Sequence, residues 1–85
     1  MIFEFTPNGT CSKHMSFDIE NDVIQHYSVI GGCPGNLTGI KHLIEGMNIH
    51  DVIRKFDGIT CGNKPTSCPD QIARALKQYI AENNL

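Results

Sequence analysis

Four cysteines are the residues of this 85-residue chain whose type and spacing favour a chemical role. Cys11, Cys33, Cys61 and Cys68 each stand beside a turn signal of glycine, proline or asparagine. Cysteines held on turns can converge on one point, whereas a cysteine inside a strand or a helix usually packs as a small apolar residue. Four thiolates in a tetrahedron fit zinc, and sulfur-only sites also suit iron–sulfur clusters. We therefore predict a metal site, zinc in the first place, held by these four cysteines.

Cys68 has the clearest physical reason to be a ligand. Pro69 and Asp70 follow it and are typical of the first turn of a helix, with Cys68 at or next to the N-cap and Pro69 suited to the first helical position. A helix N-terminus favours negative charge, so the thiolate form that binds metal or attacks an electrophile is favoured there. The alternative is that Cys68 replaces serine as a cap and has no chemistry.

Cys61 allows a second interpretation. Six residues separate it from Cys68, a looser spacing than that of the common zinc knuckle. Cys61 and Cys68 could instead cycle as a redox dithiol that passes electrons to a partner enzyme. A third alternative is a plain interaction domain with inert thiols.

Other kinds of site have weaker patterns. The glycines before the first helix could hold an anion, with Gly35 and Asn36 as contacts, although a structural turn is the favoured explanation. Three of the four histidines fall on predicted strands and helices, and His14 lies three positions after Cys11. No Ser/His/Asp order, P-loop or paired-carboxylate motif is present. Seven scattered basic residues and a net charge of −2 argue against nucleic-acid binding. No leader or membrane segment is recognisable, so we expect a cytoplasmic protein without a membrane partner.

The elements that must position these residues predict an α+β fold in a single domain over residues 1–85. Alternating apolar residues over 15–19 and a β-branched run over 23–30 flank an Asn21-Asp22 turn, which predicts a hairpin. Residues 2–5 could add a third strand. We thus expect a two- to three-stranded antiparallel meander, followed by three helices packed on one face.

Capping residues mark the three predicted helices. Asn36 is expected to cap the first helix and Gly46 to end it. Asn48 is expected to cap a second, shorter helix that stops before Gly58. The last helix starts at the Cys68-Pro69 pair and is the clearest of the predicted elements.

The segment Thr66-Ser67-Cys68-Pro69-Asp70-Gln71 resembles the signature of the TSCPD domain family. The segments around Cys11, Cys33, Gly46 and Cys61 are similar to the rest of that family's pattern, from about residue 9 to residue 81. TSCPD domains occur as small free-standing proteins and as C-terminal modules of ribonucleoside-diphosphate reductases. The resemblance implies an association with deoxynucleotide and DNA synthesis, and a reductase subunit as partner. It does not imply full reductase activity, because 85 residues leave no room for the catalytic barrel.

A fainter resemblance links the chain to the U-type iron–sulfur scaffold proteins. Cys11, Cys33 and Cys68 match the order and setting of three metal-binding cysteines in that family. The chain departs from its pattern at Ser12-Lys13 and at Ser67, where the scaffold has Gly-Asp and histidine. This resemblance implies a scaffold-like fold and metal location, with Cys61 in place of the histidine ligand.

Overall fold

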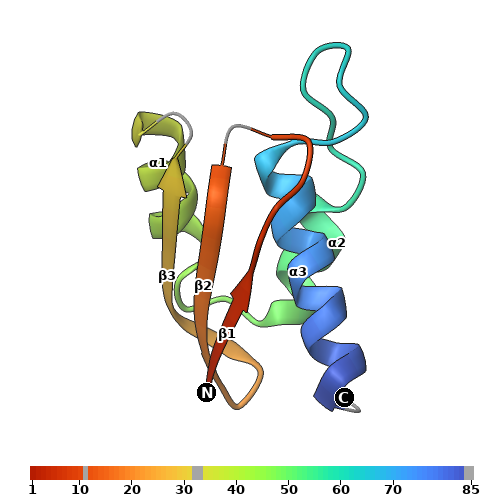
Figure 1. Cartoon of the computed structure of the whole chain (residues 1–85). Coiled ribbons are helices and arrows are strands. Elements are labelled where there is room, and N and C mark those ends of the chain that lie inside the picture. Colours follow the sequence, from red (N-terminus) through yellow and green to blue (C-terminus); the bar gives the residue numbers. More distant parts are fainter. Residues whose placement is uncertain (11, 32–33, 84–85) are drawn as a thin grey trace.

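Over the residues that it describes, the chain forms a three-stranded antiparallel sheet followed by three helices (Figure 1). The computed structural model describes residues 1–10, 12–31 and 34–83, except for the side chains of residues 34–36. The elements are β1 (Ile2–Phe5), β2 (Ser12–Glu20), β3 (Val23–Gly31), α1 (Pro34–Ile44), α2 (Ile49–Phe56) and α3 (Cys68–Asn83). The predicted α+β class, including the third strand, is confirmed.

The central hairpin is formed as expected. Asn21 and Asp22 have φ angles of 53° and 63°, the left-handed pair that a two-residue hairpin turn requires. Met15, Phe17 and Ile19 of β2 are buried because alternate residues of a strand point to the same face. That face of the sheet forms one wall of the core.

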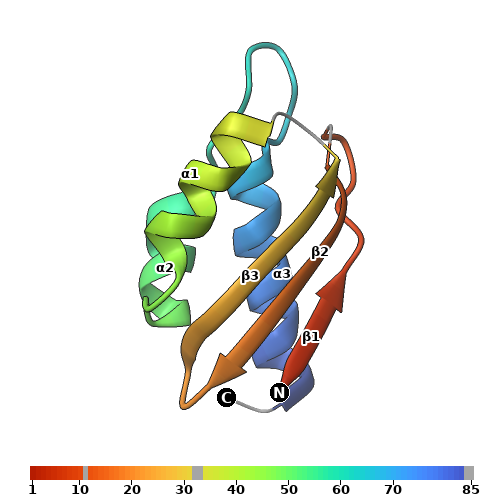
Figure 2. The same cartoon turned by 90° about the vertical axis from the view of Figure 1, so that its left-hand side faces the viewer.

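The helices pack against this face of the sheet and form the other side of the core. Figures 1 and 2 show α3 across one face of the sheet, α2 packed beside α3, and α1 alongside β3. Ile72 and Leu76 of α3 are fully buried, and Tyr79 meets Phe3 of β1 edge-to-face with ring centroids 5.5 Å apart. None of the described helices is long and apolar enough to cross a membrane.

The helix boundaries confirm most of the predicted caps and correct one. Asn48 caps α2, since its side chain accepts a hydrogen bond from the His50 N–H at 2.9 Å. Gly46 follows α1 with a φ of +91°, a conformation that favours glycine. The prediction that Asn36 is the N-cap of the first helix was wrong: α1 begins at Pro34, whose fixed φ suits the first turn.

Candidate functional site

Cys68 opens α3 at the end of the molecule where β2 begins. Its sulfur lies 2.9 Å from the hydroxyl oxygen of Ser12, a buried residue at the start of β2. Ser67 caps the helix, because its hydroxyl oxygen accepts a hydrogen bond from the Asp70 N–H at 3.2 Å. Cys68 is therefore the first helical residue and Pro69 the second, one position later than expected for Pro69.

Cys61 lies at the same cavity as Cys68 because the loop after α2 folds back on itself. The Cys61 N–H donates to the Thr66 carbonyl at 3.2 Å, and the Lys64 N–H donates to the Cys61 carbonyl at 3.0 Å. Cys61 and Cys68, both free thiols, line one cavity of about 60 Å³ together with Thr10. The structure thus brings together two of the four predicted ligands at a space of a few water volumes.

Cys11 and Cys33 lie outside the described residues, and so their predicted roles as ligands stay predictions. Thr10 and Ser12, the residues on either side of Cys11 in the sequence, lie at the cavity and at Cys68 respectively. Ser12 also pairs with Gly31, the last residue of β3. The described parts of the chain hold no group of three or more histidine, cysteine, aspartate or glutamate side chains placed to share a metal ion.

Two buried hydroxyls near this region have no hydrogen-bond partner among the described residues: Thr10 Oγ1 and Tyr27 Oη. Tyr27 is fully buried, and burial raises the pKa of its hydroxyl well above the usual range, with a smaller contribution from the Cys68 thiol. An unpaired buried hydroxyl costs free energy, so both groups are available to a ligand that would pair them. Neither residue was singled out by the sequence, where a lone threonine or tyrosine carries no such signal.

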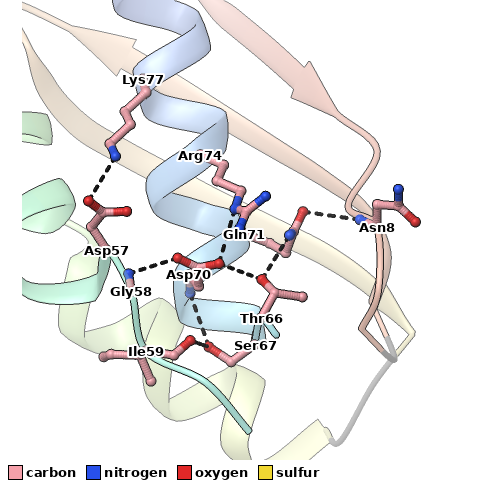
Figure 3. Close-up of polar contacts among 10 residues, drawn as sticks. All are labelled: Asn8, Asp57, Gly58, Ile59, Thr66, Ser67, Asp70, Gln71, Arg74 and Lys77. Atoms are coloured by element: carbon pink, nitrogen blue, oxygen red, sulfur yellow. Dashed lines mark hydrogen bonds and ion pairs between the residues drawn. The ribbon is translucent and has the colours of Figure 1, made fainter. Parts of the chain in front are cut away.

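Asp70 ties the cysteine-bearing loop to α3 (Figure 3). Its side chain is 3% exposed and accepts hydrogen bonds from the Gly58 N–H at 2.8 Å, the Arg74 Nε–H at 3.0 Å and the Thr66 hydroxyl. These donors hold the pKa of Asp70 below its usual value, the Thr66 hydrogen bond being the largest cause and burial opposing it. Sequence reasoning gave Asp70 only a role at the helix dipole.

Two neighbours of Asp70 extend this network. The Gln71 amide donates to Thr66 Oγ1 at 2.9 Å and accepts from the Asn8 N–H at 3.0 Å, which joins α3 to the segment before β2 (Figure 3). The Ser67 hydroxyl donates to the Ile59 carbonyl at 2.6 Å. The Ser-x-x-Asp spacing of residues 67–70 is the capping pattern that could have pointed to part of this network. We call residues 58, 66, 67, 70 and 71 the loop anchor.

The histidines are not among the described residues that line the cysteine cavity. His14 faces Glu4 at 3.0 Å, and His26 faces Glu45 at 3.2 Å. Gly35 and Asn36 belong to the first turns of α1, and their side chains lie outside what the structure describes. Anion binding by these residues stays a prediction.

Comparisons with known proteins agree with the strongest sequence resemblance. A search of curated proteins and a search of solved structures each gave no match, so the fainter likeness to iron–sulfur scaffold proteins gains no support. The TSCPD domain family, in contrast, matches residues 2–80, which takes in every strand and nearly all of the last helix. The chain belongs to the TSCPD domain family.

Proposed function

We propose that this chain is a cysteine-based metal-binding module, with zinc as the metal and Cys11, Cys33, Cys61 and Cys68 as the ligands. One observation carries the proposal: Cys61 and Cys68 line the same small cavity although six residues separate them in the sequence. Sulfur ligands and a confined site suit zinc, and a cluster of iron and sulfide is the less favoured occupant.

The described neighbours of the other two cysteines support the same site. Thr10 lines the cavity, Ser12 contacts Cys68, and Gly31 pairs with Ser12 two residues before Cys33 in the sequence. Chain segments that flank all four cysteines therefore meet at one end of the molecule. Ser12 adds a hydroxyl that can donate to a sulfur ligand and stabilise its negative charge.

Metal analysis of protein purified without added metal tests this proposal. We expect about one equivalent of zinc, and its loss in Cys68→Ser and Cys61→Ser. Ser28→Ala, a change of similar size at an exposed position of β3, is the matched control and should keep the metal. Fully folded, metal-free wild-type protein that also fails to take up added zinc would overturn the proposal, with folding followed by circular dichroism.

Membership of the family supports a proposal about the partner of this site. We propose that the module docks on a ribonucleoside-diphosphate reductase subunit and serves deoxynucleotide synthesis, as the family's occurrence in such enzymes implies. Co-elution of the zinc-loaded chain with a purified reductase in gel filtration is the expected result. Independent elution at micromolar concentrations of both proteins would contradict the proposed docking on a reductase but would not contradict the proposed metal site.

A dithiol function is the second candidate, favoured by the two free thiols at one cavity. In that reaction Cys61 and Cys68 lose two protons and two electrons and form one S–S bond, while a disulfide of the partner takes them up and opens to two thiols. Mild oxidation should then give a 61–68 disulfide, identified by peptide mass mapping. Zinc that blocks both its formation and the alkylation of Cys68 would favour the metal site instead.

A further inference from the structure

The outer edge of β3 is only partly covered. Because the sheet order is β1-β2-β3, one side of β3 has no neighbouring strand among the described residues. The Gly46 N–H donates to the Ile24 carbonyl at 2.7 Å, and the Ile24 N–H donates to the Met47 carbonyl at 3.0 Å. The turn that follows α1 thus already pairs with the first part of that edge.

Two side chains, Lys41 of α1 and Glu45 just after it, cover the middle of the same edge. The Tyr27 N–H donates to Glu45 Oε2 at 3.0 Å, and the Tyr27 carbonyl accepts from Lys41 Nζ at 3.1 Å. Glu45 also pairs with Lys41, and these donors hold the pKa of Glu45 below its usual value, Lys41 being the first cause. A carboxylate and an ammonium group therefore replace the two hydrogen bonds that a fourth strand would make at Tyr27.

The last part of the edge, from Val29 to the end of β3, has no such cover. Val29 follows Tyr27 by two residues in an unshifted stretch of the β2–β3 ladder, so its N–H and C=O also point away from β2. No residue within 1–10, 12–31 or 34–83 bonds to them outside that ladder. An open groove of about 470 Å³ lies beside them, between β3 and the α1 residues Leu37, Thr38 and Lys41.

From this arrangement we infer that the β3–α1 groove binds an extended segment of a partner protein, which adds to β3 as a fourth strand beyond Val29. Extended backbone is the occupant because only it presents an N–H and a C=O at the spacing of the Val29 pair. The buried Leu37 and the partly buried Val29 give the groove an apolar component for one side chain of the segment. This surface is separate from the cysteine cavity, so the inference does not depend on the proposed function.

A second copy of the chain fits this edge less well than a free segment. α1 runs alongside β3 (Figure 2), so pairing two β3 edges about a two-fold axis would bring both copies of α1 to the same junction. To pair with β3 without this clash between helices, the added strand must have no helix beside it. Self-association is thus the competing outcome of the test.

The test is selection of a phage-displayed library of random linear peptides, about seven residues long, against the immobilised chain. We expect enriched peptides that shift the Val29 amide signal in NMR spectra. The enriched peptides are then synthesised and their affinity is measured. Thr38→Arg, which fills the groove from an exposed position, should lower the affinity of the chain for these peptides about tenfold or more. Val29→Pro, which removes the outward N–H and keeps the β2 ladder, should do the same.

Leu43→Arg is the matched control, because it adds the same charge to α1 at a residue that is 61% exposed and outside the groove. It should leave peptide affinity unchanged. Failure to enrich any peptide, or peptides that bind wild type and Thr38→Arg equally, would overturn the inference. So would a concentration-dependent dimer of the chain that Val29→Pro abolishes.

Discussion

Replacing Asp70 by asparagine tests whether the loop anchor stabilises the fold. The substitution keeps the side-chain volume and removes the charge, so Gly58 can keep its acceptor while Thr66 and Arg74 lose the oxygen that both of them use. A hydrogen bond to a charged, buried acceptor contributes about 1.5–3 kcal/mol. The half-exposed Arg74 adds no more than about 1 kcal/mol.

Part of this loss is recovered, because the Thr66 hydroxyl can turn and accept from the new amide group. We therefore expect Asp70→Asn to lower the free energy of unfolding by about 2 kcal/mol at neutral pH. For a domain of this size that corresponds to a fall in Tm of roughly 8–16 °C. Urea unfolding followed by circular dichroism measures the first quantity, and a thermal melt measures the second.

The pH dependence separates the lost charge from a general packing defect. The pKa of Asp70 is lowered in the folded chain, so its contribution is present above the unfolded value of about 3.9 and is lost as pH falls through the folded pKa. The difference in stability between wild type and Asp70→Asn should therefore shrink below about pH 4.

Asp57→Asn is the matched control. Asp57 pairs with Lys77 at 2.8 Å, but both side chains are about half exposed, at 46% and 51%. Its loss should cost less than about 1 kcal/mol. The reasoning fails if Asp70→Asn costs no more than Asp57→Asn at neutral pH, or if its cost is the same at pH 7 and pH 3.

Three further changes probe other parts of the fold. Asn48→Ala removes the cap of α2, and its unfolding free energy should fall by about 1 kcal/mol in a urea titration; an unchanged midpoint would contradict the cap. Tyr27→Phe removes a buried hydroxyl that no described residue pairs, so metal-free protein should be at least as stable as wild type, and a Tm several degrees lower would show a missed partner. Gly9→Ala should lower the Tm, because Gly9 has a φ of +81° and a Cβ there would lie 3.0 Å from Thr66 Cγ2; an equal Tm would show that the loop yields.

Local signals in the sequence were enough for the elements of the fold. The Asn21-Asp22 turn, the alternation along β2 and the Asn48 cap are each decided by neighbouring residues, and each was predicted correctly. With Asn36 as the N-cap, the start of α1 was predicted three residues too late, because Asn36 and Pro34 are both good starts for a helix. Nothing local decides between two such starts when they are this close.

The candidate site was less predictable, since it depends on contacts between distant segments. Cys61 and Cys68 could be chosen as candidate site residues from their residue type alone. Their position at one cavity, however, depends on a loop closed by the hydrogen bond between Cys61 and Thr66. The role of Asp70 depends on Gly58, twelve residues earlier. A helix-start pattern predicts that an aspartate lies in the first turn of a helix. It does not predict which distant backbone N–H will donate a hydrogen bond to that aspartate.

The loop anchor has a consequence for how any ligand would bind at the cysteine cavity. Since Asp70 and Ser67 hold Gly58 and Ile59 at one end of the loop, and Thr66 is held at the other, the conformational entropy of the intervening residues is lost when the chain folds. A ligand then meets Cys61 and Cys68 already in place and does not have to order the loop that carries them. Loosening the anchor would therefore weaken binding chiefly by returning that entropy to the free protein.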